Sequence, residues 1–159
     1  MEFTGDFGAI GAGLALGIGV AAGTPERPQV VIEGDGSFFQ HLQELETVVR
    51  ERLQLVVVIM NDAGYGAEVF KMRAKGFDST LAQWDSPDFV AVSRALGGDG
   101  IRLQSETEIG DALNIGLKQG GLYLIDARIS PTSPTDRYLK HHFGEENQAP
   151  LLRRGLNID

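Results

Sequence analysis

Short apolar runs alternate with segments of helical spacing along this chain of 159 residues. Residues 53–61 and 121–129 are apolar on both faces, which is typical of strands buried within a parallel sheet. Residues 30–33 form a shorter apolar run that also predicts a buried strand, and residues 100–103 indicate a fourth strand.

The segment between the first two strands predicts a helix over residues 37–52, because apolar residues recur there at helical spacing. Ser37 is a favourable N-cap, and Gln40 three residues later completes the pattern of a capping box. Glu46 and Arg50 are spaced to form an ion pair on the outer face of this helix.

Further helices are expected before and after this pair of strands. The glycine-rich segment 11–23 indicates a buried helix, and residues 88–96 predict another. Residues 105–118 predict a third, with Ser105 and Glu108 as a second capping box. Strands that alternate with helices favour an α/β fold, here a three-layer α/β/α arrangement with a mostly parallel central sheet.

Composition narrows the classes of function. The chain is 42% hydrophobic and 23% charged, which is ordinary for a globular protein, and no apolar run is long enough to span a bilayer. The absence of cysteine excludes disulfides, thiolate metal sites and iron–sulfur clusters, and it fits the cytoplasmic location that we expect. A net charge of −8 argues against nucleic acid as the main partner.

Two acidic residues are predicted to meet at one edge of the sheet. Asp35 stands between Gly34 and Gly36 where the first strand ends, and Asp62 follows the next strand. A crossover between parallel strands brings both ends to the edge where open α/β folds bind ligands. The start of the helix predicted at Ser37 favours the binding of a phosphate. The two acids would repel this phosphate, and a Mg²⁺ bound between them removes that repulsion. We interpret Asp35 as a metal ligand, although Gly-Asp-Gly alone is also common in turns.

The order of these motifs resembles the family of thiamine-diphosphate-dependent enzymes. Between GDG and NDAGYG lie 24 residues, a pattern similar to the cofactor motif of that family. The segments GDFGAIGAGLALGIGVA, GSFFQHLQELETVVR, PDFVAVSRALGGDGIRL and LIDARISP also resemble its C-terminal diphosphate-binding (PP) domain. The resemblance covers residues 5–131 and points to the acetolactate synthase-like and 2-oxo acid decarboxylase branch.

The resemblance implies a set of Mg²⁺ ligands. They are the carboxylates of Asp35 and Asp62 and the backbone carbonyl of Gly64, while Gly34 and Gly36 would line the diphosphate. Asp62 stands where the family more commonly has asparagine, and its additional negative charge is expected to strengthen Mg²⁺ binding.

Other positions imply contacts with thiamine diphosphate itself. Ser37 would also line the diphosphate. Ile10 matches the bulky aliphatic residue that props the cofactor into a bent shape, and the carbonyl of Gly8 would meet the aminopyrimidine ring. Asn61 and Tyr65 are candidate cofactor-binding residues, with a packing role as an equal alternative for Tyr65.

The activity that the resemblance implies is decarboxylation of a small 2-oxo acid or its carboligation to a second carbonyl compound. Glu68 matches a position that carries a catalytic glutamate in some 2-oxo acid decarboxylases, and the alternative is a solvated helix face. Family members need a pyrimidine-binding domain, on a missing region or a separate subunit. We therefore expect a homo-oligomer, a dimer or tetramer, and a fragment or subunit that is inactive alone.

Residues 1–131 are predicted to form the PP domain, lacking its usual first strand, and residues 132–159 a C-terminal arm or tail. Two other classes of function were weighed against the enzyme. One is a non-catalytic module that binds the cofactor or serves assembly. The other is an unrelated nucleotide-binding α/β domain, which is disfavoured because no P-loop or GxGxxG follows the first strand.

Overall fold

The computed structural model describes residues 9–143, which form two compact units. Within these residues, the first unit comprises residues 9–61 and 86–128, and the second comprises residues 62–85 and 129–143. The first unit contains the sheet and the second is mainly helical. No helix between residues 9 and 143 combines the length and the apolar character needed to cross a bilayer.

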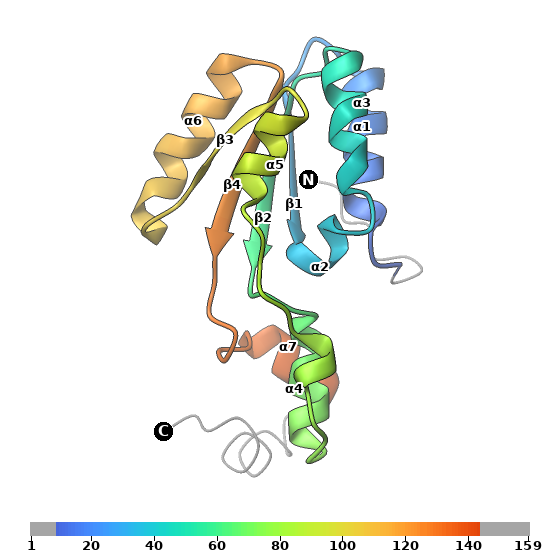
Figure 1. Ribbon diagram of the computed structural model, residues 1–159, viewed down its shortest axis with the longest axis vertical. Coiled ribbons are helices and arrows are strands. Elements are labelled where there is room, and N and C mark those ends of the chain that lie inside the picture. Colours follow the sequence, from blue (N-terminus) through green and yellow to red (C-terminus); the bar gives the residue numbers. More distant parts are fainter. Residues whose placement is uncertain (1–8, 144–159) are drawn as a thin grey trace. The chain divides into compact units, whose positions relative to one another are not determined.

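The first unit is built on a four-stranded sheet in the order β1-β2-β4-β3, in which all neighbouring strands are parallel (Figure 1). The strands are β1 (Gln29–Gly34), β2 (Leu55–Asn61), β3 (Asp99–Arg102) and β4 (Leu122–Arg128). The predicted strands are confirmed to within two residues at each end. As its apolar faces predict, β2 lies inside the sheet, between β1 and β4.

Helices cover both faces of the sheet and confirm the three-layer arrangement (Figure 1). On one face lie α1 (Ala12–Gly23), α3 (Leu45–Arg50) and α5 (Phe89–Ala95). On the other face lies α6 (Ile109–Gln119). The helix predicted over residues 88–96 is confirmed, and Asp88 caps it by accepting a hydrogen bond from the Ala91 N–H at 2.9 Å.

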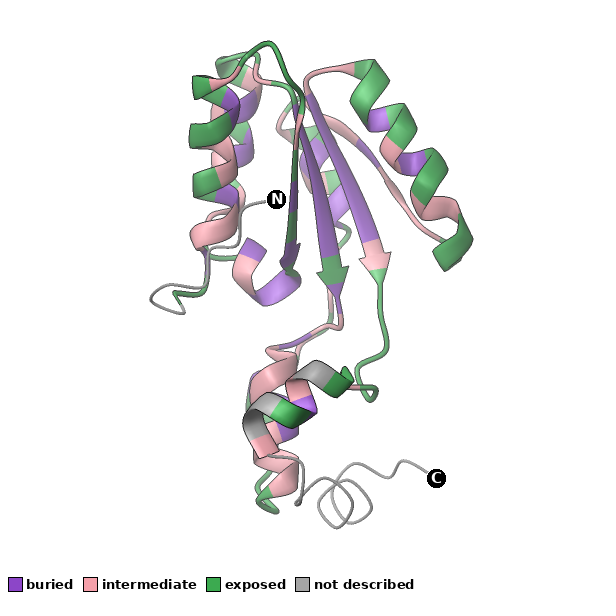
Figure 2. Cartoon of the chain, turned by 180° about the vertical axis from the view of Figure 1, so that it is seen from behind, coloured by how far each residue is buried: buried purple, intermediate pink, exposed green. Residues whose placement is uncertain are grey.

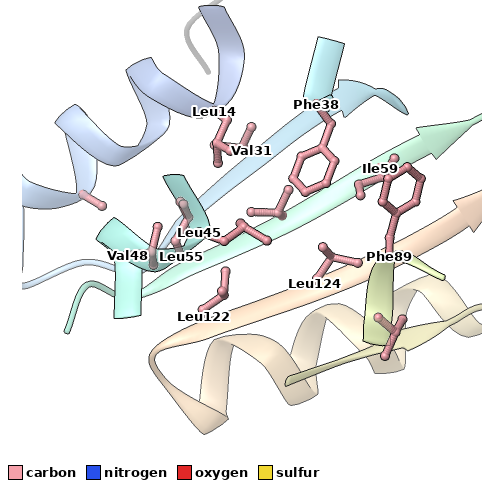
Figure 3. Packing of buried hydrophobic residues seen from close by; sticks show 13 residues of the cluster. Leu14, Val31, Phe38, Leu45, Val48, Leu55, Ile59, Phe89, Leu122 and Leu124 are labelled. Carbon is pink, nitrogen blue, oxygen red and sulfur yellow. The ribbon is translucent and has the colours of Figure 1, made fainter. Parts of the chain in front are cut away.

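The core follows the alternation of side chains along β2. Leu55, Val57 and Ile59 point into the larger cluster, where Figure 3 shows Leu55 and Ile59 among side chains from α1, α3 and α5. Val56 and Val58 point to the other face, into a smaller cluster with α6. Full burial of such a side chain stabilises the fold by about 1.5–3 kcal/mol relative to exposure.

Strand β1 differs from the prediction, because only one of its faces is buried. Val31 and Glu33 are 8% and 9% exposed, whereas Val30 and Ile32 are 41% and 64% exposed. Figure 2 shows the contrast with β2 and β4, which are buried along most of their length. The apolar composition of residues 30–33 therefore predicted the strand but not its position at an edge of this sheet.

The single helix predicted over residues 37–52 is wrong. The segment contains α2 (Asp35–Phe38), a 3₁₀ turn (Leu42–Glu44) and α3. The chain leaves helical geometry at His41, where φ is −135°. The break lets Phe38 pack edge-on against Phe89, with ring centroids 5.3 Å apart. The helical spacing of apolar residues is preserved across the break, so the pattern alone did not reveal it.

Both predicted capping boxes are also wrong. The Ser37 hydroxyl bonds outside its own helix, as described below, and α2 begins two residues before it. Ser105 pairs with the Thr107 hydroxyl at 2.7 Å, and Glu108 accepts from the Gln104 N–H at 2.9 Å. Local side-chain partners thus replace the reciprocal backbone bonds of a box.

The predicted ion pair in the same region is confirmed. Arg50 Nε lies 3.2 Å from Glu46 Oε1, with both side chains more than half exposed. An exposed pair of this kind contributes about 0.3–0.5 kcal/mol.

The second unit contains α4 (Gly66–Ala74), a short 3₁₀ turn (Thr80–Ala82) and α7 (Asp136–Phe143). Tyr138 on α7 donates a 2.6 Å hydrogen bond to the Ala67 carbonyl, and its ring lies 5.7 Å from that of Phe70. Burial raises the pKa of Tyr138 to about 12. Part of the predicted tail is therefore a helix that packs on α4.

Glycines let α1 lie directly on β1. A Cβ at Gly13 would come within 2.7 Å of Glu33 Oε2, and a Cβ at Gly17 would overlap the side chain of Val31. Gly13 and Gly17 are one helical turn apart, and Glu33 and Val31 share one face of the strand. The glycine-rich composition of this segment thus has a packing reason, in addition to any role near a ligand.

We predict that Gly17→Ala destabilises the protein, because the stiff, buried side chain of Val31 leaves no room for a methyl group. The expected loss in the free energy of unfolding is about 1–3 kcal/mol, measured by urea denaturation. Gly19→Ala is the matched control, since no atom of the described part of the chain lies within 4 Å of its added Cβ. The control should gain roughly 0.5–1 kcal/mol from helix propensity, and equal effects of the two changes would contradict the packing described here.

Candidate functional site

The carboxyl ends of β1 and β2 meet at one edge of the sheet. Gly34, the last residue of β1, is paired with Met60, and β2 ends one residue later at Asn61. Asp35 follows β1 as the first residue of α2 and is fully buried. Ionised carboxylates at buried positions are typically paired with an opposite charge or bound to metal ions. The position of Asp35 therefore suits a residue that binds a cation.

Gly34, next to Asp35 in the chain, has open space at the position of an added Cβ among the residues that the structure describes. Its φ of −74° is accessible to any residue, and an added Cβ would meet only the Met60 carbonyl at 4.0 Å. Neither the backbone conformation nor the packing of residues 9–143 therefore demands glycine here. A ligand that approaches the backbone closely would explain the residue, and this fits the predicted role in lining a diphosphate. Gly36, the next predicted lining residue, is buried within α2.

The α2 segment is shorter than the sequence led us to expect. It has four residues rather than a long helix starting at Ser37, so the dipole of a long helix is absent from this turn. What remains for an anion is the group of backbone N–H donors in the first turn.

Ser37 belongs to a hydrogen-bond network that the sequence did not predict. Its hydroxyl donates to Glu33 Oε2 at 2.7 Å and accepts from the Gly11 N–H at 3.0 Å. The hydroxyl proton is thus directed to Glu33, and the backbone N–H of Ser37 is the group left to meet a diphosphate. One feature of the sequence could have indicated a role for Glu33. It is an acidic residue on the face of β1 that also carries the apolar Val31.

Glu33 is held in a buried environment. Desolvation raises the pKa of its carboxyl above the usual value, and this effect is opposed by hydrogen bonds from Ser37 and the Leu14 N–H and by the charge of His41. The carboxyl oxygen Oε1 has no hydrogen-bond partner among the residues that the structure describes.

Asn61 bonds with side chains of its own unit. Its amide nitrogen donates to Asp126 Oδ1 at 2.7 Å and to the Ser86 hydroxyl at 2.9 Å. Asp126 is fully buried in β4 and lies 2.9 Å from Arg102 Nε and 3.4 Å from Arg128 Nε. The cofactor contact predicted for Asn61 stays a prediction. Asp126 could have been suspected as the one acid within an apolar strand.

The remaining predicted metal ligands, Asp62 and Gly64, lie in the second unit. The Asp62 carboxylate lies against Gly66, the first residue of α4, where an added Cβ would overlap it. Ala63 has a left-handed φ of 59°. Gly64 forms an isolated bridge with Gln83, and an added Cβ would come within 2.7 Å of the Ala82 carbonyl. The tight turn therefore needs glycine at 64.

Tyr65 and Glu68 have ordinary surroundings within the second unit. The ring of Tyr65 packs edge-on against Trp84 with centroids 5.0 Å apart, which favours the packing alternative for this residue. The Glu68 side chain on α4 is 46% exposed and lies 3.6 Å from Lys71 Nζ. This is the geometry of a solvated helix face, and a catalytic role for Glu68 stays a prediction.

The residues predicted to prop and contact the cofactor lie before α1. Ile10 is 54% exposed, so its side chain is available to a ligand. Gly8 lies outside the described residues. Among the side chains that the structure describes, no group of three or more His, Cys, Asp or Glu could hold a metal ion. The Mg²⁺ ligands predicted from the sequence include only two such side chains, Asp35 and Asp62, because the third ligand is the backbone carbonyl of Gly64.

Comparison with known proteins gives a family match over most of the chain. Residues 2–127 match the model of the thiamine pyrophosphate enzyme, C-terminal TPP binding domain. An acetolactate synthase isozyme 3 large subunit of Escherichia coli is 32% identical over 98% of this chain. A putative acetolactate synthase large subunit of Mycobacterium tuberculosis is 32% identical over 80% of it, and a probable 2-ketoarginine decarboxylase of Pseudomonas aeruginosa is 34% identical over 77%.

Solved structures show the same fold. A benzoylformate decarboxylase from Polynucleobacter necessarius superposes with a TM-score of 0.73 at 24% identity, covering 81% of this chain and 25% of that one. The three relatives above are likewise matched over 26%, 23% and 22% of their own lengths. The chain thus spans about a quarter of the proteins it resembles. It belongs to the thiamine pyrophosphate enzyme family, and the part that matches is the C-terminal domain that binds the cofactor.

Proposed function

We propose that this chain is the diphosphate-binding half of a thiamine-diphosphate-dependent enzyme that acts on 2-oxo acids. The observation that carries the proposal is the family match over residues 2–127, in which GDG falls at the carboxyl end of β1 and NDAGYG at that of β2. The register of Gly34 with Met60 supports it, because both motifs leave the sheet at one edge.

The proposed Mg²⁺ ligands are the carboxylates of Asp35 and Asp62 and the carbonyl of Gly64. Gly34, Gly36 and the Ser37 backbone would receive the diphosphate. The open space beside Gly34 and the burial of Asp35 support this assignment. Two carboxylates and a carbonyl are oxygen ligands of the kind that Mg²⁺ prefers.

Farther along the cofactor, Ile10 would prop the bent form, with Gly8 and Tyr65 beside it. The bound cofactor would supply the electron sink that decarboxylation of a 2-oxo acid requires. This chain would hold and orient the cofactor. The proton chemistry that activates it would come from a pyrimidine-binding domain, within one larger polypeptide or on another subunit of a homo-oligomer.

The substrate class follows from the chemistry shared by the relatives. 2-Ketoarginine and benzoylformate are both 2-oxo acids, and the acetolactate synthases among the relatives point to carboligation as an alternative outcome. We therefore propose a small 2-oxo acid as substrate, with either protonation or carboligation completing the reaction.

We predict that Asp35→Asn weakens Mg²⁺-dependent binding of thiamine diphosphate by at least about tenfold, because it removes an anionic ligand. Calorimetric titration with and without Mg²⁺ measures the change. Asp88→Asn is the matched control, since asparagine remains a good N-cap and Asp88 lies on an exposed helix start. Wild-type affinity in the Asp35→Asn variant would exclude the proposed site.

We predict that Asp62→Asn shifts the Mg²⁺ requirement upward. The substitution keeps an oxygen ligand but removes one negative charge, so a higher Mg²⁺ concentration is needed for half-maximal cofactor binding. Titrations of thiamine diphosphate at a series of Mg²⁺ concentrations measure this. If both proteins bound the cofactor equally well at every concentration, Asp62 would have no role in holding the metal.

A further inference from the structure

Glu33 is a carboxylate where the pattern of β1 calls for an apolar side chain. It shares the buried face of the strand with Val31 and is 9% exposed. Burying a carboxyl group is costly unless other groups compensate it. Packing in the core therefore does not by itself explain why a glutamate occupies this position.

Its first set of contacts is with the start of α1. Gly11 occupies the N-cap position with a φ of 95° and has no side chain to cap the helix. The Glu33 carboxylate instead lies against the first turn of this helix. Gly13 leaves the room for this approach, because a Cβ there would lie 2.7 Å from Glu33 Oε2. Glu33 thus places a carboxylate beside the first turn of α1, where backbone N–H groups lack partners within the helix.

Its second contact is with the turn that follows β1. Glu33 Oε2 accepts the Ser37 hydroxyl at 2.7 Å, and the Ser37 oxygen accepts the Gly11 N–H at 3.0 Å. Glu33, Ser37 and Gly11 therefore form a continuous chain of hydrogen bonds. This chain joins the GDGS turn to the residue that follows Ile10.

We propose that Glu33 is a positioning residue that fastens the start of α1 to the GDGS turn, so that the two parts of the cofactor site keep a fixed separation. This inference rests on the proposed function, in which the turn receives the diphosphate and Ile10 props the rest of the cofactor. Loss of Glu33 would leave each part present but free to shift against the other. A cofactor that must span both parts is then affected more than a ligand that needs the turn alone.

The alternative is that Glu33 has a purely structural role and only stabilises the fold. If Glu33 only stabilises the fold, its loss lowers the free energy of unfolding but changes the affinities for a large and a small ligand by the same factor. A positioning role changes their ratio. Inorganic pyrophosphate is the small probe, because it carries the diphosphate and lacks the thiazolium and pyrimidine rings.

The test measures the affinities of the chain for thiamine diphosphate and for inorganic pyrophosphate by calorimetry, both with Mg²⁺. The variants are Glu33→Ala and Glu33→Gln. Glutamine keeps an oxygen that can accept the hydrogen bond from the Ser37 hydroxyl. Glu46→Ala and Glu46→Gln are the matched controls, because Glu46 is exposed on α3. Protection of the first α1 amides in hydrogen exchange is read in the same samples.

The expected result is that Glu33→Ala reduces the preference for thiamine diphosphate over pyrophosphate by about tenfold, in the range known for residues that orient a site through others. The α1 amides should exchange faster, Glu33→Gln should restore most of the preference, and the Glu46 variants should match wild type. If Glu33→Ala does not fold, Ser37→Ala cuts the same chain of bonds, and the preference should fall in that variant too.

An unchanged preference in a folded Glu33→Ala protein, or in Ser37→Ala in its place, would overturn the positioning role while leaving the proposed function intact. A wild-type chain that binds no thiamine diphosphate at any Mg²⁺ concentration would overturn the proposed function, and the positioning role with it. The two failures are therefore distinguishable.

Discussion

Parallel pairing of β1 with β2 is the constraint on which the candidate site depends. The register that places Gly34 beside Met60 means that the chain leaves both strands at the same edge. Two motifs that are 24 residues apart in sequence thereby start from neighbouring positions. Packing on both faces of β2 holds this register, because a slip by one residue would exchange Leu55, Val57 and Ile59 with the valines that fill the smaller cluster on the other face.

A chain of hydrogen bonds through Glu33 and Ser37 adds a second connection near the candidate site. Glu33 accepts a hydrogen bond from the Ser37 hydroxyl, whose oxygen accepts one from the Gly11 N–H, and this chain ties the start of α1 to the turn after β1. The glycines on α1 serve the same contact, because Gly13 and Gly17 let the helix approach the strand. The glycine-rich segment, predicted as a helix, thus packs through two of its glycines directly on the strand that carries Glu33. Asp126 offers a parallel case, since a buried acid fixes the Asn61 side chain.

The sequence predicted what depends on local pattern or on family motifs. The strands, the three layers and the family followed from apolar runs and from GDG with NDAGYG. Three features depend on tertiary contacts and were not predicted: the break at His41, the exposure of Ile32 on an edge strand, and the partners of Ser37. Each of these depends on residues distant in sequence, such as Phe89 for the break. The roles of Asp35, Asp62 and Gly64 stay predictions, because no bound ligand tests them.

The most direct test of the account is a crystal structure of the chain grown with thiamine diphosphate and Mg²⁺. The account predicts one ion with the carboxylates of Asp35 and Asp62 and the carbonyl of Gly64 at about 2.1 Å, bridging to the diphosphate. A bound cofactor whose metal is held by other residues, with these two carboxylates directed elsewhere, would contradict it.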